Sequence, residues 1–154
     1  MSSIANKRIL KELKEFSENH SSSDSLLSLV SSQDELDNII ININIKDNEL
    51  YDSNRPFTLS YKINKNYPFT PPQIIFIGNN IPIHPHIYSN GHICLNILYD
   101  NWTPVQTISS VVLSLQSMLI NNKVLEKPPD DDNYCKHGPS DPLQAKWVFH
   151  DDTV

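Results

Sequence analysis

A cysteine in an irregular stretch of the chain is the strongest candidate for chemistry. Cys94 lies in residues 91–98, where polar and apolar residues mix around it and a glycine, Gly91, stands three positions earlier. A thiolate on an irregular segment is open to a large partner, which favours a nucleophilic role. The alternative is a structural cysteine, because cysteine is among the most buried residue types. Composition alone leaves both interpretations open.

Histidines and cysteines around this segment offer a second chemistry, a zinc site. Six candidate ligands form three pairs, each with one residue between its members: His84 and His86, His92 and Cys94, Cys135 and His137. Structural zinc sites usually space their ligands as C-x₂₋₄-C or H-x₃₋₅-H. The third pair also lies far downstream, in a proline-rich tail. We therefore expect no metal and keep a zinc-bound interaction domain as a remote alternative.

Composition argues against several classes of function. Twelve Lys and Arg against eighteen Asp and Glu give a net charge of −6, which disfavours nucleic acid or an anionic membrane as a partner. Three glycines are too few for a Gly-rich phosphate loop. The acidic runs at 130–132 and 151–152 are typical of solvated surface and give little support to a hydrolase. Two cysteines are too few for a disulfide framework, which indicates the cytoplasm or the nucleus.

The elements that must position Cys94 form one α+β domain over residues 1–154. The spacing of apolar residues predicts an amphipathic helix over 3–18 and a second helix over about 108–120. Between them, four short apolar runs with short connections predict an antiparallel meander: 26–31, 39–45, 57–63 and 73–77. Residues 79–107 form an irregular segment. No run is long and apolar enough to span a membrane.

Four motifs resemble the ubiquitin-conjugating enzymes, in their order and in their separations. They are Y-P-F-T-P-P at 67–72, H-P-H at 84–86, N-G-H-I-C-L-N-I-L at 90–98 and W-T-P at 102–104. The resemblance covers residues 3 to about 122 and includes the basic first helix, the meander and the helix at 108–120. Within the family, His-Pro-His in place of His-Pro-Asn and the ending at 146–152 are similar to the W type. That type directs ubiquitin to the α-amino group of substrate N-termini.

The resemblance implies that Cys94 accepts ubiquitin as a thioester and passes it to a substrate amine. His86 replaces the family's asparagine, and its imidazole N–H either donates to the oxyanion of the reaction or only holds the loop. Asp130 or Asp131 lies where the family often has an aspartate beside the thioester, although a solvated acidic run is the alternative. An α-amine, with a pKa of about 7.7–8 against about 10.4 for lysine, needs less deprotonation by the enzyme.

The resemblance also implies three protein partners: ubiquitin, a ubiquitin-activating enzyme, and a RING or U-box ligase. Phe69 and Pro104 match the two ligase-docking loops, although Phe69 is equally suited to capping the core. Four basic residues match the helix that contacts the activating enzyme: Lys7, Arg8, Lys11 and Lys14. The expected substrates are proteins with flexible N-termini. No cofactor is expected to bind, since the activating enzyme consumes the ATP.

The C-terminal part departs most clearly from the family. Most members finish with two further helices, whereas residues 121–154 have too many prolines for both, so a short, irregular and partly mobile segment is expected. Trp147 and Phe149 either pack on the domain or form a binding surface. Other readings of the whole chain are a lysine-directed enzyme, a carrier of another ubiquitin-like protein, and a non-catalytic ubiquitin-binding module of the same fold.

Overall fold

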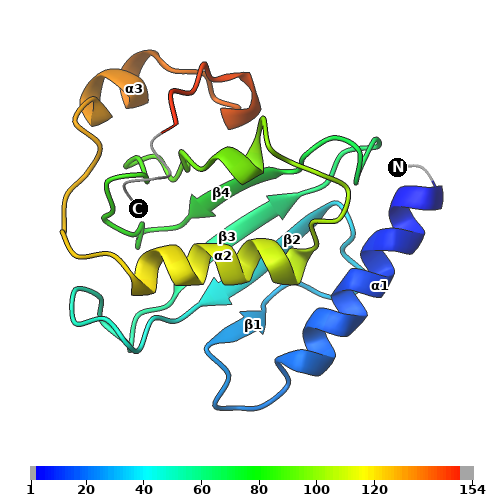
Figure 1. The fold of residues 1–154 in the computed structure, drawn as a ribbon. Coiled ribbons are helices and arrows are strands. Elements are labelled where there is room, and N and C mark those ends of the chain that lie inside the picture. The colour runs from blue at the N-terminus through cyan, green and yellow to red at the C-terminus, as the bar shows by residue number, and fades with distance from the viewer. Residues whose placement is uncertain (1–2, 150–154) are drawn as a thin grey trace.

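The first helix buries a single apolar stripe. In the computed structural model of the chain, which describes residues 3–149, α1 spans Ser3–Asn19 (Figure 1). The apolar residues three or four positions apart are almost fully buried: Ala5, Ile9, Leu13 and Phe16. The helix predicted over residues 3–18 is confirmed. One acidic residue, Glu12, is buried beside the stripe, which the apolar pattern did not indicate.

The sheet is the predicted antiparallel meander, with its strands in sequence order. The strands are β1 (Leu27–Leu29), β2 (Asn38–Ile43), β3 (Phe57–Lys62) and β4 (Gln73–Ile77). Buried and more exposed residues alternate along β2, β3 and β4, as a sheet with one covered face requires. Register places Ile41 opposite Leu59 and Leu59 opposite Phe76, which forms a continuous apolar row across the sheet.

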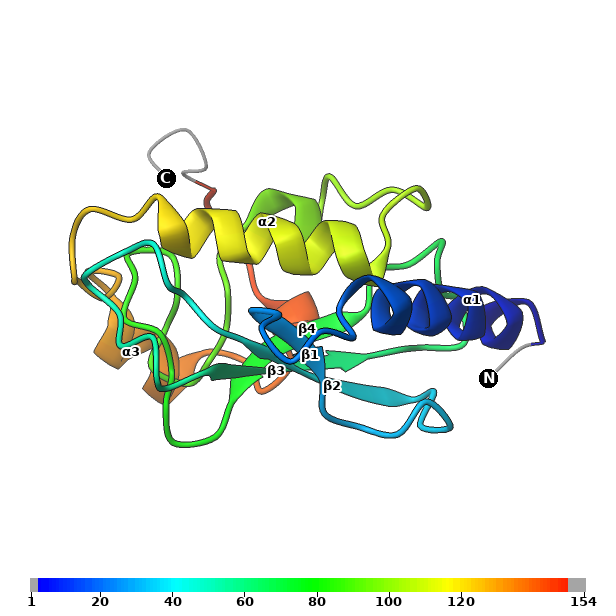
Figure 2. The same ribbon diagram turned by 90° about the horizontal axis from the view of Figure 1, so that it is seen from below.

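The second long helix covers the apolar face of this sheet. α2 spans Ile108–Ile120, as predicted, and crosses above the strands (Figure 2). A capping box starts it: the Thr107 hydroxyl accepts from the Ser110 N–H, and the Ser110 hydroxyl accepts from the Thr107 N–H. No helix within residues 3–149 combines the length and the apolar character that a membrane crossing requires.

The C-terminal part is more regular than the sequence predicted. After an extended stretch, a short helix, α3, spans Asp131–His137, and a 3₁₀ turn, η2, follows at Pro142–Gln144. Another 3₁₀ turn, η1, lies before α2, at Asn96–Leu98. Acidic residues in the first turn of α3 and basic residues in its last turn suit the helix dipole. The two additional long helices are absent from the described part, as expected, and the mobility of this part stays a prediction. Positions 150–152 of the C-terminal motif lie outside the described residues.

Candidate active site

A hairpin at the edge of the sheet holds Cys94. The Cys94 N–H donates to the His86 carbonyl at 2.8 Å, and the Tyr88 N–H donates to the His92 carbonyl at 2.9 Å. His92 in turn bridges Ile75 of β4. The hairpin of residues 84–94 therefore continues from the edge of the sheet and places Cys94 opposite His86.

Gly91 forms the turn of this hairpin and its contact with the sheet. Its φ of +88° lies in the left-handed region that favours glycine. The Gly91 carbonyl accepts from the Phe76 N–H of β4 at 3.0 Å. A Cβ atom at this position would lie 1.8 Å from the Phe76 carbonyl oxygen. Only glycine fits where the hairpin meets the sheet.

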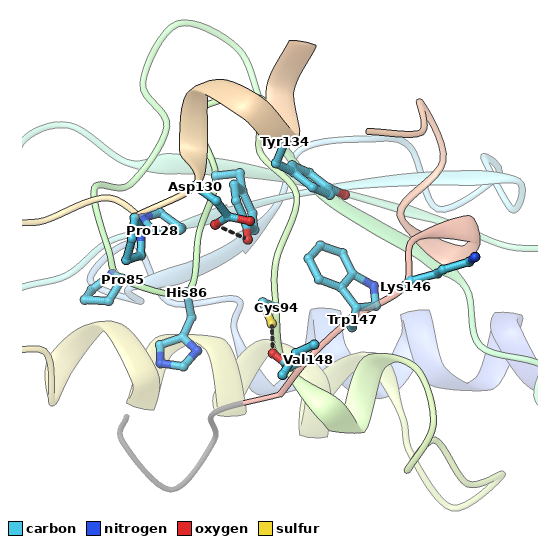
Figure 3. A pocket seen from close by; sticks show the side chains of 11 residues that line it. Pro85, His86, Cys94, Pro128, Asp130, Tyr134, Lys146, Trp147 and Val148 are labelled. Carbon is cyan, nitrogen blue, oxygen red and sulfur yellow. Dashed lines mark hydrogen bonds between the residues drawn. The ribbon is translucent and has the colours of Figure 1, made fainter. Parts of the chain in front are cut away.

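The two histidines of the His-Pro-His motif are both buried and differ in their contacts. His84 Nδ1 accepts from the His86 N–H at 2.9 Å, and the same ring bonds to the Met118 backbone of α2. Burial, followed by the neighbouring His86, lowers the pKa of His84 to about 4, so its ring is neutral at pH 7. His84 thus ties the hairpin to α2. His86 is 5% exposed and lies on the wall of the cavity beside Cys94 (Figure 3).

Cys94 opens into a cavity of about 460 Å³ formed by three separate parts of the chain. The hairpin supplies one wall, Pro128–Asp130 and α3 supply another, and residues 146–148 close the third (Figure 3). Cys94 is 7% exposed, and its Sγ donates to the Val148 carbonyl at 3.6 Å. The C-terminal segment therefore covers the cysteine directly.

The structure separates the two candidate aspartates. The Asp130 carboxylate lines the cavity and accepts from the Tyr88 hydroxyl at 2.9 Å. The Asp131 carboxylate accepts instead from the Ser89 N–H, at 2.8 Å, and from the Ser89 hydroxyl. Burial acts to raise the pKa of Asp131, but the hydrogen bonds from Ser89 outweigh it and hold that pKa below its usual value. Only Asp130 is placed to meet a ligand beside Cys94.

Five packed aromatic rings, which we call the aromatic cluster, attach the C-terminal segment to the domain. Its members are Tyr88, Tyr99, Tyr134, Trp147 and Phe149. Ring centroids lie 5.2 Å apart for Tyr99 and Trp147 and 4.1 Å apart for Tyr88 and Tyr134. The Trp147 indole N–H donates to the Pro142 carbonyl at 3.0 Å.

The aromatic cluster was only partly visible in the sequence. For Trp147 and Phe149, packing on the domain was one of the two predicted alternatives, and both rings do pack on it. The three tyrosines were missed, because isolated tyrosines far apart in the chain carry no periodic signal. Burial is the main cause that raises the pKa of each of these tyrosines, so all three hydroxyls stay protonated at pH 7.

The other candidate metal ligands make separate contacts. His92 Nδ1 lies 2.6 Å from the Tyr134 hydroxyl, and the Cys135 thiol donates to Asp131 at 3.6 Å. Burial raises the pKa of Cys135 and keeps it a thiol. Across residues 3–149, no three His, Cys, Asp or Glu side chains are grouped so that they could hold a metal ion.

Two loops that carry exposed apolar side chains lie at the opposite end of the domain from α3 (Figure 1). Phe69 is 72% exposed, so it does not cap the core. Pro104 is exposed as well, and its neighbour Val105, which sequence reasoning missed, is 80% exposed. The Trp102 indole N–H donates to the Pro68 carbonyl at 2.8 Å and ties the two loops to each other.

The four basic residues of α1 do not behave alike. Lys7, Lys11 and Lys14 are exposed. Arg8 is half-buried, and its guanidinium bonds to the Glu12 carboxylate and to two backbone carbonyls of the loop that carries Pro104. Only the lysines present their charge on an open face.

Comparison with known proteins gives a family and a fold. A family model described as "Ubiquitin-conjugating enzyme" matches residues 8–143. The chain is 43% identical over 155 residues to a probable ubiquitin-conjugating enzyme E2 W of Dictyostelium discoideum, and the alignment covers 100% of both chains. It is 50% identical over 97 residues to a probable ubiquitin-conjugating enzyme E2 W-A of Danio rerio; that alignment spans 63% of this chain and 64% of the relative.

A solved structure is similar over most of the chain. The ubiquitin conjugating enzyme E2 UbcA1 from Agrocybe aegerita superposes with a TM-score of 0.82 at 33% identity. The superposition covers 92% of this chain and 99% of that one. The predicted family and the predicted α+β fold are both confirmed.

Proposed function

The chain belongs to the ubiquitin-conjugating enzymes, and from that premise we propose that it carries ubiquitin on Cys94 and transfers it to the α-amino group of a protein N-terminus. The Cys94 thiolate attacks the thioester that joins ubiquitin to the activating enzyme, and the thiolate of that enzyme leaves. The neutral substrate amine then attacks the Cys94 thioester, an amide forms, the Cys94 thiolate leaves, and the proton lost by the amine passes to that thiolate or to solvent. The observation that carries the proposal is the cavity in which Cys94, His86 and Asp130 meet.

Asp130 gives this cavity a means of recognising an amine. Its carboxylate, bonded to the Tyr88 hydroxyl, stands among aromatic rings, and both features attract an ammonium group. We therefore assign Asp130 to orienting the substrate N-terminus. No base is assigned to the enzyme, because part of the α-amine is already neutral at pH 7.

His86 is assigned to the thioester side of the same cavity. Its backbone carbonyl fixes the Cys94 N–H, and its buried imidazole is a donor beside the reacting carbon. His86→Asn restores the residue that the family has at this position. This variant should gain some reactivity toward lysine without full conversion, because the C-terminal segment still differs.

The remaining partners follow from the surfaces. Phe69, Pro104 and Val105 are proposed to dock a RING or U-box ligase, because exposed apolar side chains on held loops suit a small, transient interface. Lys7, Lys11 and Lys14 are proposed to meet the activating enzyme. No bound cofactor is proposed, ATP being consumed upstream, and the proposed compartment is the cytoplasm or the nucleus.

The test is a charging reaction followed by a choice of amine. Charged protein should discharge onto a lysine-free peptide with a free N-terminus, and slowly onto free lysine. Acetylation of that N-terminus should abolish transfer, since it removes the only nucleophile. Preferential discharge onto lysine would overturn the α-amine assignment and favour a lysine-directed enzyme. Failure to form a thiol-sensitive adduct with ubiquitin would overturn the carrier assignment itself.

Two neighbouring aspartates provide a matched pair of variants. Asp130→Asn should raise the KM for the peptide amine, because the carboxylate that faces the cavity loses its charge. Asp131→Asn makes the same chemical change one residue away, where the carboxylate is bonded to Ser89, and should leave that KM unchanged. Equal effects of the two variants would contradict the role of Asp130.

A further inference from the structure

We infer that Arg8 and Glu12 are positioning residues for the ligase-docking loops, and that Arg8 does not belong to the face that meets the activating enzyme. The inference rests on the proposed docking of a ligase at Phe69 and Pro104. It separates one arginine from three lysines that the sequence pattern had grouped together.

The half-buried Arg8 side chain bonds to three acceptors of the domain. Its Nη2 donates to the Pro104 carbonyl at 2.7 Å and to the Gln106 carbonyl at 3.0 Å. Its Nε donates to Glu12, one turn along α1, at 3.0 Å. A planar guanidinium can serve a carboxylate and two carbonyls at once, which a lysine ammonium on a flexible stem does poorly. Arg8 thus fixes the backbone on both sides of Val105.

Glu12 extends the same network to the other loop. Its carboxylate is 3% exposed and accepts from the Tyr67 hydroxyl, at 2.9 and 2.8 Å, and from the Ile108 N–H at 2.7 Å. Tyr67 is buried two positions before the exposed Phe69. Ile108 begins α2, directly after the loop that carries Pro104. One carboxylate therefore bonds to a residue within the first loop, Tyr67, and to the residue that follows the second loop, Ile108.

The two residues together set the relative positions of the exposed side chains. The side chains of Phe69 and Val105 are largely exposed, so burial of these side chains does little to fix their loops. The loops are instead held from beneath, by Arg8 and Glu12 and by the Trp102 bond to Pro68. A docking surface that is fixed before binding loses less entropy when the partner binds. The network should therefore increase the affinity for the ligase.

The experiment compares Arg8→Gln with Lys11→Gln, which removes the same charge from the same helix. Each variant is first loaded with ubiquitin as a thioester. It is then titrated with an isolated RING domain that accelerates the release of ubiquitin from the unsubstituted protein. Arg8→Gln should raise the half-saturating RING concentration about tenfold, equivalent to about 1.4 kcal/mol, with little change in the maximal rate. Lys11→Gln should slow charging by the activating enzyme and leave the RING titration unchanged.

Further variants keep the test decisive if Arg8→Gln folds poorly. Tyr67→Phe removes only the hydroxyl that Glu12 accepts, and Arg8→Lys keeps the charge but not the fork of donors; both should raise the half-saturating concentration by a smaller factor. Slower charging with an unchanged RING titration in the Arg8 variants would overturn the inference. Phe69→Ala tests the proposed docking surface on which the inference rests. If Phe69→Ala leaves the RING titration unchanged, both the docking surface and the inference are wrong.

Discussion

Two regions of the molecule are held together by different kinds of contact. Around Glu12, one buried carboxylate accepts hydrogen bonds from α1, from the loop before Phe69 and from the start of α2. Around Cys94, the aromatic cluster holds the C-terminal segment mainly through contacts between rings. A buried charge needs its full set of donors, whereas packed rings near a chain end can separate locally. The Glu12 network is thus part of the core, and the aromatic cluster is a cover.

The same contrast shows in two carboxylates with opposite pKa shifts. Burial raises the pKa of Glu12, although the hydrogen bonds from Tyr67, Ile108 and Arg8 act against it. Asp131, beside the aromatic cluster, has a lowered pKa because the bonds from Ser89 outweigh its burial. The Glu12 carboxylate is desolvated, but it connects α1, the loop before Phe69 and the start of α2. The Asp131 carboxylate connects only α3 to Ser89 of the hairpin.

The largest expected effect is at the residue that the cover protects. Cys94→Ala should abolish charging by ubiquitin, and Cys94→Ser should give a slow, thiol-resistant ester or no adduct, because a hydroxyl is a poor nucleophile without a dedicated base. Adducts are read on reducing and non-reducing gels. Cys135→Ala, which changes the second free cysteine, should charge normally. Charging of Cys94→Ala through Cys135 would contradict the site assignment.

Removing one contact from each region tests the contrast itself. Glu12→Ala should lower the free energy of unfolding by about 3–5 kcal/mol, since it leaves buried donors and a charged partner uncompensated. Removal of a fully buried aromatic ring lowers the free energy of unfolding by about 3–5 kcal/mol. Trp147→Ala should lower it by less, because Trp147 is only half-buried.

The two variants should also differ in the reactivity of Cys94. Trp147→Ala loosens the segment whose Val148 carbonyl accepts from the thiol, so alkylation by iodoacetamide should accelerate. Denaturant unfolding and alkylation under native conditions measure the two effects. Equal losses of stability, with unchanged alkylation in Trp147→Ala, would show that the aromatic cluster is core and not cover.

A smaller effect is expected at the loops that the Glu12 network supports. Phe69→Ala should weaken ligase-stimulated discharge by about 1–3 kcal/mol and leave charging and thermal stability nearly intact, because the ring is exposed. Leu125→Ala, at an exposed apolar position between α2 and α3, is the matched control and should change neither step. A loss of thermal stability together with equal loss in both steps would assign Phe69 to the core.

The smallest effects are two pH dependences of opposite sign. With a raised folded-state pKa, the contribution of Glu12 to stability is full below about pH 4.5 and is lost as the pH rises through that raised pKa. Asp131 has a lowered folded-state pKa, so its contribution to stability is present above about pH 3.8 and is lost as the pH falls through that lowered pKa. Glu12→Gln should remove the first dependence and Asp131→Asn the second. Urea unfolding from pH 3 to 8 measures both, and slopes of the same sign would refute the assignment.

Much of the fold was predictable because it follows from repeating apolar patterns. The alternation in residues 39–45 and 57–63 predicts strands that pair in register, and the stripe of α2 predicts its buried face. These features depend on local periodicity. The motifs marked the stretch around His86 and Cys94, but its hairpin was not predicted, because residues 79–107 were expected to be irregular.

What sequence reasoning missed depends on contacts between distant residues. Glu12 falls next to an apolar stripe, and nothing local shows that Tyr67 and Ile108 will satisfy its carboxylate. α3 is too short for a periodic signal, and its first residue is held by Ser89 of the hairpin. Arg8 looks like its neighbouring lysines until the carbonyls of Pro104 and Gln106 are seen above it.

Gly91 has a consequence for how this sequence can change over generations. The atom that a side chain at position 91 would strike belongs to the backbone of β4, so no second substitution can clear the space by shortening a neighbour. Most core positions tolerate exchange when a partner changes size in compensation. Position 91 has no such partner, so the position of Cys94 relative to the sheet is kept only as long as the glycine is kept.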